Sequence, residues 1–354
     1  MAGTPSVPHY GGYLRLDEML GLQRPGRDLL HHDEMLFIVV HQVFELWFRL
    51  ILYEMEAARD VLGRTGAAAG KPAVAEEDIP RVCEHLARVT EIQRVLIEQF
   101  RVMETMPPTH FLAFRDALIP ASGFQSVQFR EIEVLAGLNE ETRGKMTTAS
   151  FHDAYTDDER ARIARRAGEM SISDALFDWL VRTPIDRAAP NFVAEYVAEF
   201  DRYQAEQRAA HQASPHLTQK EKDAAAAALE IASEACRKFL TGYDERTNRA
   251  HAAFVFIAVH REEPLLRWPY ALIDRVVEFE EYLRLWRFRH ARMVERMIGT
   301  RVGTGGSPGV GYLDHTASNY RIFGRLLEAR SFLLDPRRLP PLADPKIFRF
   351  QFEG

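Results

Sequence analysis

HDEMLFIVVHQVFELWF, residues 32–48, is apolar at nearly every position of the helix that its spacing predicts. A helix that lacks a polar face belongs either in the interior of a protein or in a membrane. The uncharged run from Met35 to Phe44 is too short to span a bilayer, and Glu45 interrupts the residues that follow. We therefore predict a core helix and no membrane segment.

One histidine, His41, lies inside this predicted core helix. Helical spacing puts Phe37 one turn before it, and Phe44 and Glu45 one turn after it on the same side. A lone histidine on an apolar helix face is more often a hydrogen-bonded core residue than a ligand or a catalytic group. From the spacing alone, both interpretations of His41 stay open.

The composition of the 354-residue chain is that of a globular protein, with 46% hydrophobic and 27% charged residues. The formal net charge is -6 and the arginines are spread along the helices, which argues against nucleic-acid binding. Two cysteines, Cys83 and Cys236, favour a reducing compartment without a disulfide framework. The first ten residues lack the basic-then-apolar pattern of a secretion signal. We therefore expect a cytoplasmic protein that binds neither nucleic acid nor membranes.

Helical periodicity continues along the rest of the chain, and the alternating pattern of strands is almost absent. We predict an all-α fold, a single structural unit in which residues 1–139 and 264–354 form a helical core around a pocket. Residues 140–263 would form an inserted helical subdomain. Beyond the core helix, the predicted helices cover residues 79–106, 110–118, 174–181, 192–210, 218–240 and 269–298.

Missing motifs exclude several chemistries. The glycine-rich segment 303–311 (GTGGSPGVG) lacks the Gly-Lys-Ser/Thr of a phosphate loop and follows a helix, so we interpret it as a mobile loop that closes over a pocket. The zinc motif His-Glu-x-x-His, zinc-type cysteine spacing and a serine nucleophile elbow are absent. The His-x-Asp formed by His31 and Asp33 could belong to a non-haem iron site, but that ligand set is usually carried on a β-barrel.

Two histidines and one arginine remain as candidate functional groups. His290 shares the predicted helix 269–298 with Trp286 and, like His41, has aromatic neighbours. A flat apolar cofactor held between helices, with a histidine as axial ligand, fits this pattern, although hydrogen-bonded core histidines are more common. Arg115, one turn after Phe111, is either paired with a protein carboxylate, which composition favours, or reserved for the carboxylate of a ligand.

Six sequence motifs, in order, resemble those of the tryptophan 2,3-dioxygenase family. Any one of them alone would be weak, but together they extend from Tyr10 to about Leu334, and the chain is identified as a member of this family on their order. The length of the helical insert resembles that of the longer members. The motifs are YGGYL (10–14), HDEMLFIVVHQVFELW (32–47), FLAFR (111–115), PASGFQS (120–126), WRFRH (286–290) and GTGGS (303–307).

The resemblance implies an enzyme that uses haem b. It would open the indole C2=C3 bond of L-tryptophan with O2 to give N-formylkynurenine, the first step of the kynurenine pathway. His290 would be the proximal ligand of the haem iron. Trp286, Arg130 and Tyr312 would lie beside the haem or its propionates.

On the substrate side, the resemblance implies that His41 hydrogen-bonds the indole N–H. Phe37 and Phe111 would pack against the indole ring, and Arg115 would hold the substrate carboxylate. Thr304, on the closing loop, would meet the ammonium and carboxylate groups of the amino acid.

The resemblance also implies an interleaved homotetramer, in which Tyr10 and Tyr13 reach the pocket of a neighbouring subunit. Pro308 stands where a serine is more usual, which bears on the mobility of the closing loop. Two alternatives stay open: a related haem oxygenase that acts on a substituted tryptophan in a biosynthetic pathway, and a non-catalytic haem-binding protein. A helical bundle with a purely structural role is the simplest alternative.

Overall fold

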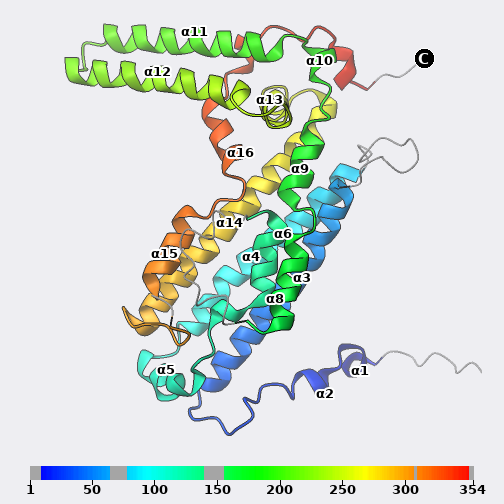
Figure 1. The fold of residues 1–354 in the computed structure, drawn as a ribbon, viewed down its shortest axis with the longest axis vertical. Helices are drawn as coiled ribbons and strands as arrows, with labels where there is room; N and C mark the ends of the chain where they lie inside the picture. Colours follow the sequence, from blue (N-terminus) through cyan, green and yellow to red (C-terminus); the bar gives the residue numbers. More distant parts are fainter. Residues whose placement is uncertain (1–8, 64–77, 139–154, 307–308, 351–354) are drawn as a thin grey trace, which may run out of the picture.

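Three long helices form the body of the molecule. The computed structural model describes residues 9–63, 78–138, 155–306 and 309–350, and within these ranges it contains helices and no β-strand. Helix α4 (Ile79–Met103) packs against both α3 (Glu34–Leu62) and α14 (Arg267–Ile298), and the three run together along the bundle (Figure 1). The predicted all-α fold is confirmed.

The apolar stripe predicted on α4 explains its central position. Val82, Leu86, Val89, Leu96 and Phe100 recur every three to seven residues, and each is at most 2% exposed. The helix ends at Met103, earlier than the predicted end at residue 106. Pro107 and Pro108 follow closely, and the helical conformation is disfavoured for a residue directly before a proline, so the helix cannot continue through this segment.

Helix α3 is the one described helix that is long and apolar enough, by length and composition alone, to cross a membrane. It packs against α4, α6 (Val127–Ala136) and α9 (Ile172–Leu180), which is the position of a core helix. One side of α3 nevertheless stays open in the single chain: Leu46 and Tyr53 are 59% and 64% exposed.

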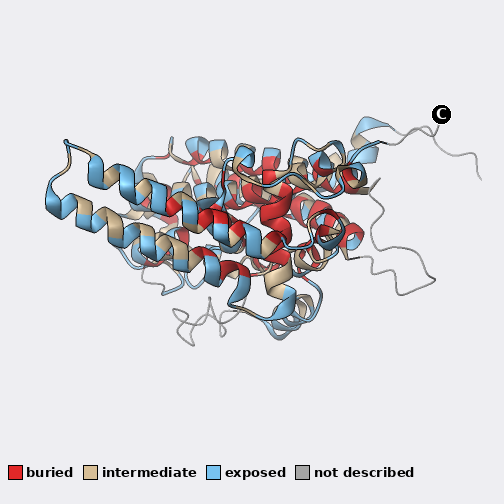
Figure 2. Cartoon of the chain, turned by 90° about the horizontal axis from the view of Figure 1, so that it is seen from above, coloured by how far each residue is buried: buried red, intermediate tan, exposed pale blue. Residues whose placement is uncertain are grey.

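The segment predicted as an insert contributes helices to two places. Helix α8 (Asp157–Ala167) packs against α6, and α9 packs against both α3 and α13 (Glu245–Val259). Helices α11 (Phe192–Ala213) and α12 (Gln219–Thr241) pair as a hairpin that projects from the bundle, and its far end is exposed (Figures 1 and 2). The division into a core and an inserted subdomain stays a prediction.

The remaining described elements are short. Helix α15 (Val310–Asn319) packs against the end of α14, and α5 (Pro108–Arg115) continues into a 3-10 turn over 116–118. The N-terminal helices extend away from the bundle (Figure 1). The other α-helices in the described ranges are α1 (Tyr10–Leu14), α2 (Leu16–Met19), α10 (Ile185–Ala188) and α16 (Gly324–Ala329).

Neither cysteine forms a disulfide. Cys83 and Cys236 are buried in the core as free thiols, as the sequence predicts. Burial raises the pKa of Cys83 to about 11 and that of Cys236 to about 12. Both thiols therefore stay protonated and unreactive at neutral pH.

Candidate active site

A cavity of about 270 Å³ opens between α3, α4, α5, α6, α14 and α15. Apolar and aromatic side chains make up more than half of its wall, including seven phenylalanines and three methionines, and histidines, arginines, glutamates and hydroxyl residues lie among them. Every predicted site residue except Tyr10 and Tyr13 lines this cavity: Phe37, His41, Phe111, Arg115, Arg130, Trp286, His290, Thr304 and Tyr312.

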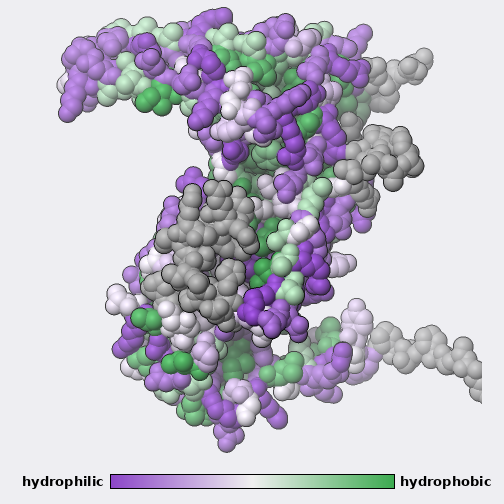
Figure 3. Space-filling model, in the orientation of Figure 1, coloured by the Kyte–Doolittle hydropathy of each residue, from purple (hydrophilic) through white to green (hydrophobic). Residues whose placement is uncertain are grey.

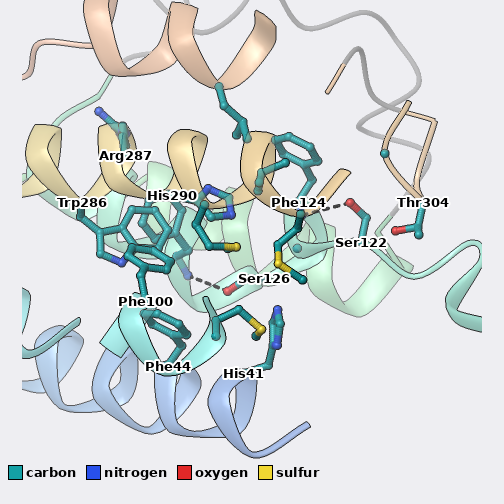
Figure 4. Close-up of a pocket in the computed structure, with 18 of the residues that line it drawn as sticks. His41, Phe44, Phe100, Ser122, Phe124, Ser126, Trp286, Arg287, His290 and Thr304 are labelled. Carbon is teal, nitrogen blue, oxygen red and sulfur yellow. Dashed lines mark hydrogen bonds between the residues drawn. The ribbon is translucent and has the colours of Figure 1, made fainter. Parts of the chain in front are cut away.

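His290 lies on α14 within an aromatic part of the wall (Figure 4). Its ring stacks on Trp286 at 5.2 Å between centroids and on Phe100 at 5.8 Å. Desolvation, together with the charge of His41, lowers the pKa of His290 to about 4. The imidazole is therefore neutral at pH 7, the form in which histidine ligates a metal ion.

His41 lies on α3 on the other side of the cavity (Figure 4). Its Nδ1 lies 2.7 Å from the carbonyl oxygen of Phe37. A carbonyl can only accept, so Nδ1 carries the proton and Nε2 of the neutral ring is left as an acceptor. Desolvation lowers the pKa of His41, against the opposing effects of that hydrogen bond and of Glu45, so the acceptor form persists at neutral pH.

Aromatic rings beside His41 form an apolar slot. The Phe37 ring lies 4.1 Å from the His41 ring, 5.7 Å from the Phe111 ring and 5.6 Å from the Phe114 ring, measured between centroids. Phe111 and Phe114 come from α5, so the contact between α3 and α5 builds this side of the cavity. The slot can hold a planar aromatic group within reach of the His41 imidazole.

Arg115, at the end of α5, has no strong ionic partner among the described residues. Its nearest carboxylate, that of Asp116, is 3.7 Å away and 88% exposed, and such surface pairs contribute little. One terminal nitrogen donates to the carbonyl oxygen of Val302, while Nε is buried without a partner. The internal ion pair that composition favours is therefore weak, and the guanidinium can still bind a carboxylate.

The loop after α14 closes against the turn before α6. Thr304 Oγ1 donates to the carbonyl oxygen of Ala121 at 2.6 Å. Gly305 follows, and a Cβ at this position would lie 2.6 Å from Cβ of Ser122, so the approach requires glycine. The predicted closing loop thus borders the cavity. Ser307 and Pro308 lie outside the described residues.

Two buried guanidinium groups share one buried carboxylate at the cavity wall. Arg287 donates to Glu133 at 2.7 Å, and their side chains are 5% and 3% exposed. Arg130 also pairs with Glu133. Burial is the largest influence on the pKa of Arg130 and lowers it, but Glu133, Tyr155 and Tyr312 together raise this pKa above its usual value. The Tyr312 ring lies 5.2 Å from the Phe124 ring, measured between centroids, and burial raises the pKa of the Tyr312 hydroxyl.

Comparison with known proteins gives a family match over most of the chain. Residues 3–333 match the family model described as tryptophan 2,3-dioxygenase. A tryptophan 2,3-dioxygenase of Sorangium cellulosum is 39% identical, with 98% of this chain and 88% of the relative covered. The chain belongs to the tryptophan 2,3-dioxygenase family. Further members include a Dictyostelium discoideum enzyme (33% identical; 98% and 88% covered) and tryptophan 2,3-dioxygenase B of Danio rerio (32%; 97% and 86%).

Two residues that the family resemblance assigns to the site do not reach the cavity of their own chain. Tyr10 and Tyr13 lie in α1 and are 73% and 78% exposed. Their predicted place in the pocket of a neighbouring subunit stays a prediction. Sequence reasoning missed two other residues, Glu133 and Arg287. Arg287 lies within the WRFRH motif (286–290). The signal that could have identified it is a charged residue at a position on the buried side of the predicted helix.

The residues around the cavity fit an iron porphyrin, the cofactor that the family implies. His290 presents a neutral imidazole to a mainly apolar space. Trp286 Nε1 is buried and has no hydrogen-bond partner among the described residues, so it is available to an acceptor on a ligand. Arg130 and Arg287 bring two guanidinium groups to the cavity wall, which suits the acidic edge of such a group.

We expect the change Glu133→Gln to destabilise the protein by about 3–5 kcal/mol, because it leaves two buried guanidinium groups without their countercharge. Urea unfolding measures the loss. The matched control is Glu98→Gln, which removes an exposed pair with Arg101 and should cost less than about 1 kcal/mol. Equal losses in the two variants would contradict the importance of the buried charge network.

Proposed function

We propose that this cavity is the active site for the reaction of the tryptophan 2,3-dioxygenase family. The chain opens the indole C2=C3 bond of L-tryptophan with O2 to give N-formylkynurenine, the first step of the kynurenine pathway. The observation that supports this assignment most directly is the placement of polar groups on two sides of the cavity. One side carries the neutral imidazole of His290. The other side carries the His41 imidazole, with Nε2 as an acceptor, and the weakly paired guanidinium of Arg115.

Haem b would bind in the cavity with His290 as its axial ligand. Trp286 would contribute ring contact and an N–H donor, and Arg130 and Tyr312 would lie on the side of the propionates. When bound, the haem iron supplies the activation of O2. The protein would limit the access of water, because apolar and aromatic side chains form more than half of the wall.

His41 would orient the indole ring. Its Nε2 is an acceptor, and an indole N–H is a donor only, so the two groups are complementary. Phe37 and Phe111, which stack on each other, would both pack against the indole ring. His41 thus acts through a hydrogen bond that fixes the ring, and removal of the indole proton is not required of it.

Arg115 would bind the carboxylate of the amino acid. A zwitterion that enters an apolar cavity without partners pays several kcal/mol in lost hydration, and a bidentate guanidinium offsets this cost. Thr304 would meet the ammonium group. Its hydroxyl proton is donated to the carbonyl oxygen of Ala121, so Oγ1 offers lone pairs to an N–H donor.

The active form would be a homotetramer. Tyr10 and Tyr13 are exposed aromatic residues on an extended N-terminal segment, and Figure 3 shows further apolar surface along that segment. The open side of α3, with Leu46 and Tyr53, adds apolar area that a second copy could cover. A cytoplasmic location is in keeping with the two free, buried cysteines.

The change His290→Ala should abolish stable haem binding, because it removes the only imidazole on its wall of the cavity among the described residues. The Soret band of the purified, haem-supplemented variant measures this loss. An unchanged Soret band together with unchanged turnover would rule out His290 as the axial ligand.

The change Arg115→Leu should raise KM for L-tryptophan by tenfold or more, since a charge-assisted hydrogen bond is worth about 1.5–3 kcal/mol. Indole analogues without a carboxylate serve as the control substrates and should be affected much less. If binding of both classes weakens equally, Arg115 does not hold the carboxylate.

The change His41→Ser should slow turnover without eliminating it, because a hydrogen bond that orients the ring contributes less than an obligatory proton transfer. Steady-state kinetics with haem content and substrate binding measured in parallel provide the test. Complete loss of turnover, with haem and tryptophan still bound, would instead assign His41 the role of an essential base.

A further inference from the structure

A cluster of two histidines and one carboxylate lies outside the cavity. His31 and Asp33 come from the segment that enters α3, and His110 comes from the first turn of α5. The two imidazole centroids are 4.5 Å apart, and His110 Nδ1 lies 2.9 Å from Asp33 Oδ2. One potential ligand atom from each side chain lies within 4.8 Å of the others, the only such group in the described part of the chain.

We propose that His31, Asp33 and His110 bind a divalent transition-metal ion, with Zn²⁺ as the simplest case. Two imidazoles and one carboxylate form a common protein ligand set for such ions, with a further position left to water. Ligand atoms around a tetrahedral Zn²⁺ are about 3.3 Å apart, so modest side-chain rotations bring these three into range. The proposed haem chemistry does not use this site.

The hydrogen bonds of the cluster already arrange the ligands. The Asp33 carboxylate can only accept at neutral pH, so His110 Nδ1 donates its proton to Asp33. A metal ion would take the place of that proton, which moves to Nε2 and leaves the imidazole neutral. His31 Nδ1 accepts from the backbone N–H of Asp33 at 3.1 Å, so an unprotonated ring nitrogen faces this segment. The three residues are partly accessible, which leaves a path for the ion and for water.

Such an ion would join the two helices that build the substrate side of the cavity. The carbonyl oxygen of Asp33 accepts from the backbone N–H of Phe37, at 3.0 Å, at the start of α3. His110 directly precedes Phe111 on α5. Metal binding would therefore hold the start of α3 to the start of α5, next to the contact between the Phe37 and Phe111 rings.

The test uses tag-free holoprotein, full length, dialysed against Zn²⁺ and analysed for zinc, with haem iron as the internal measure of chain concentration. We expect wild type to bind one zinc ion per chain, and His31→Ala and His110→Ala to bind it at least about tenfold more weakly. Zn²⁺ should raise the midpoint of thermal unfolding of wild type but not of these variants. The control is His32→Ala, which removes an exposed neighbouring histidine that is not part of the cluster and should bind zinc like wild type.

Two results would overturn the site. Absence of stoichiometric zinc binding by wild type would reduce the cluster to a hydrogen-bonded contact between α3 and α5. Equal zinc affinity in wild type and in both cluster variants would place the ion elsewhere. If His110→Ala fails to fold, His31→Ala decides the question alone, because it breaks no ion pair.

Discussion

The position of α4 between α3 and α14 is the constraint on which the site depends. His41 and His290 lie on helices far apart in sequence, and both reach one cavity because α3 and α14 pack against the same helix, α4. Phe100 of α4 contacts the rings on both sides, with centroids 5.2 Å from Phe44 and 5.8 Å from His290. The core that stabilises the bundle therefore also sets the separation between the two imidazoles.

The same apolar packing explains the charge state of the histidines in the site and the pairing of its arginines. In a poorly solvated cavity an imidazole stays neutral, which leaves a lone pair on each histidine. A buried arginine without a countercharge strongly destabilises a fold, and Glu133 supplies the countercharge for both Arg130 and Arg287. Arg115 is the exception, because its countercharge would arrive with the substrate.

Much of this arrangement could be predicted from local pattern and family motifs, and the rest could not. Helical period predicts α3, α4 and α14 and marks His41, His290 and Arg115 as candidate residues. The family motifs add Thr304 and the expected role of each of these residues. Pattern does not reveal partners separated by many residues: Glu133 and Arg287 meet only through the packing of α6 near α14. In the same way, the sequence shows His31 next to Asp33 but not the approach of His110 from another helix.

One guanidinium links the loop after α14 to the proposed amino-acid site. Arg115 donates a hydrogen bond to the carbonyl oxygen of Val302 and also lines the cavity in which the ligand carboxylate would bind. The same side chain therefore contacts the loop and the proposed substrate position. The order of events in each turnover follows from this double contact. In the proposed function, arrival of the amino acid would neutralise and immobilise the guanidinium and thereby hold the loop, and departure of the product would release both together, so that exit and reopening would become one step.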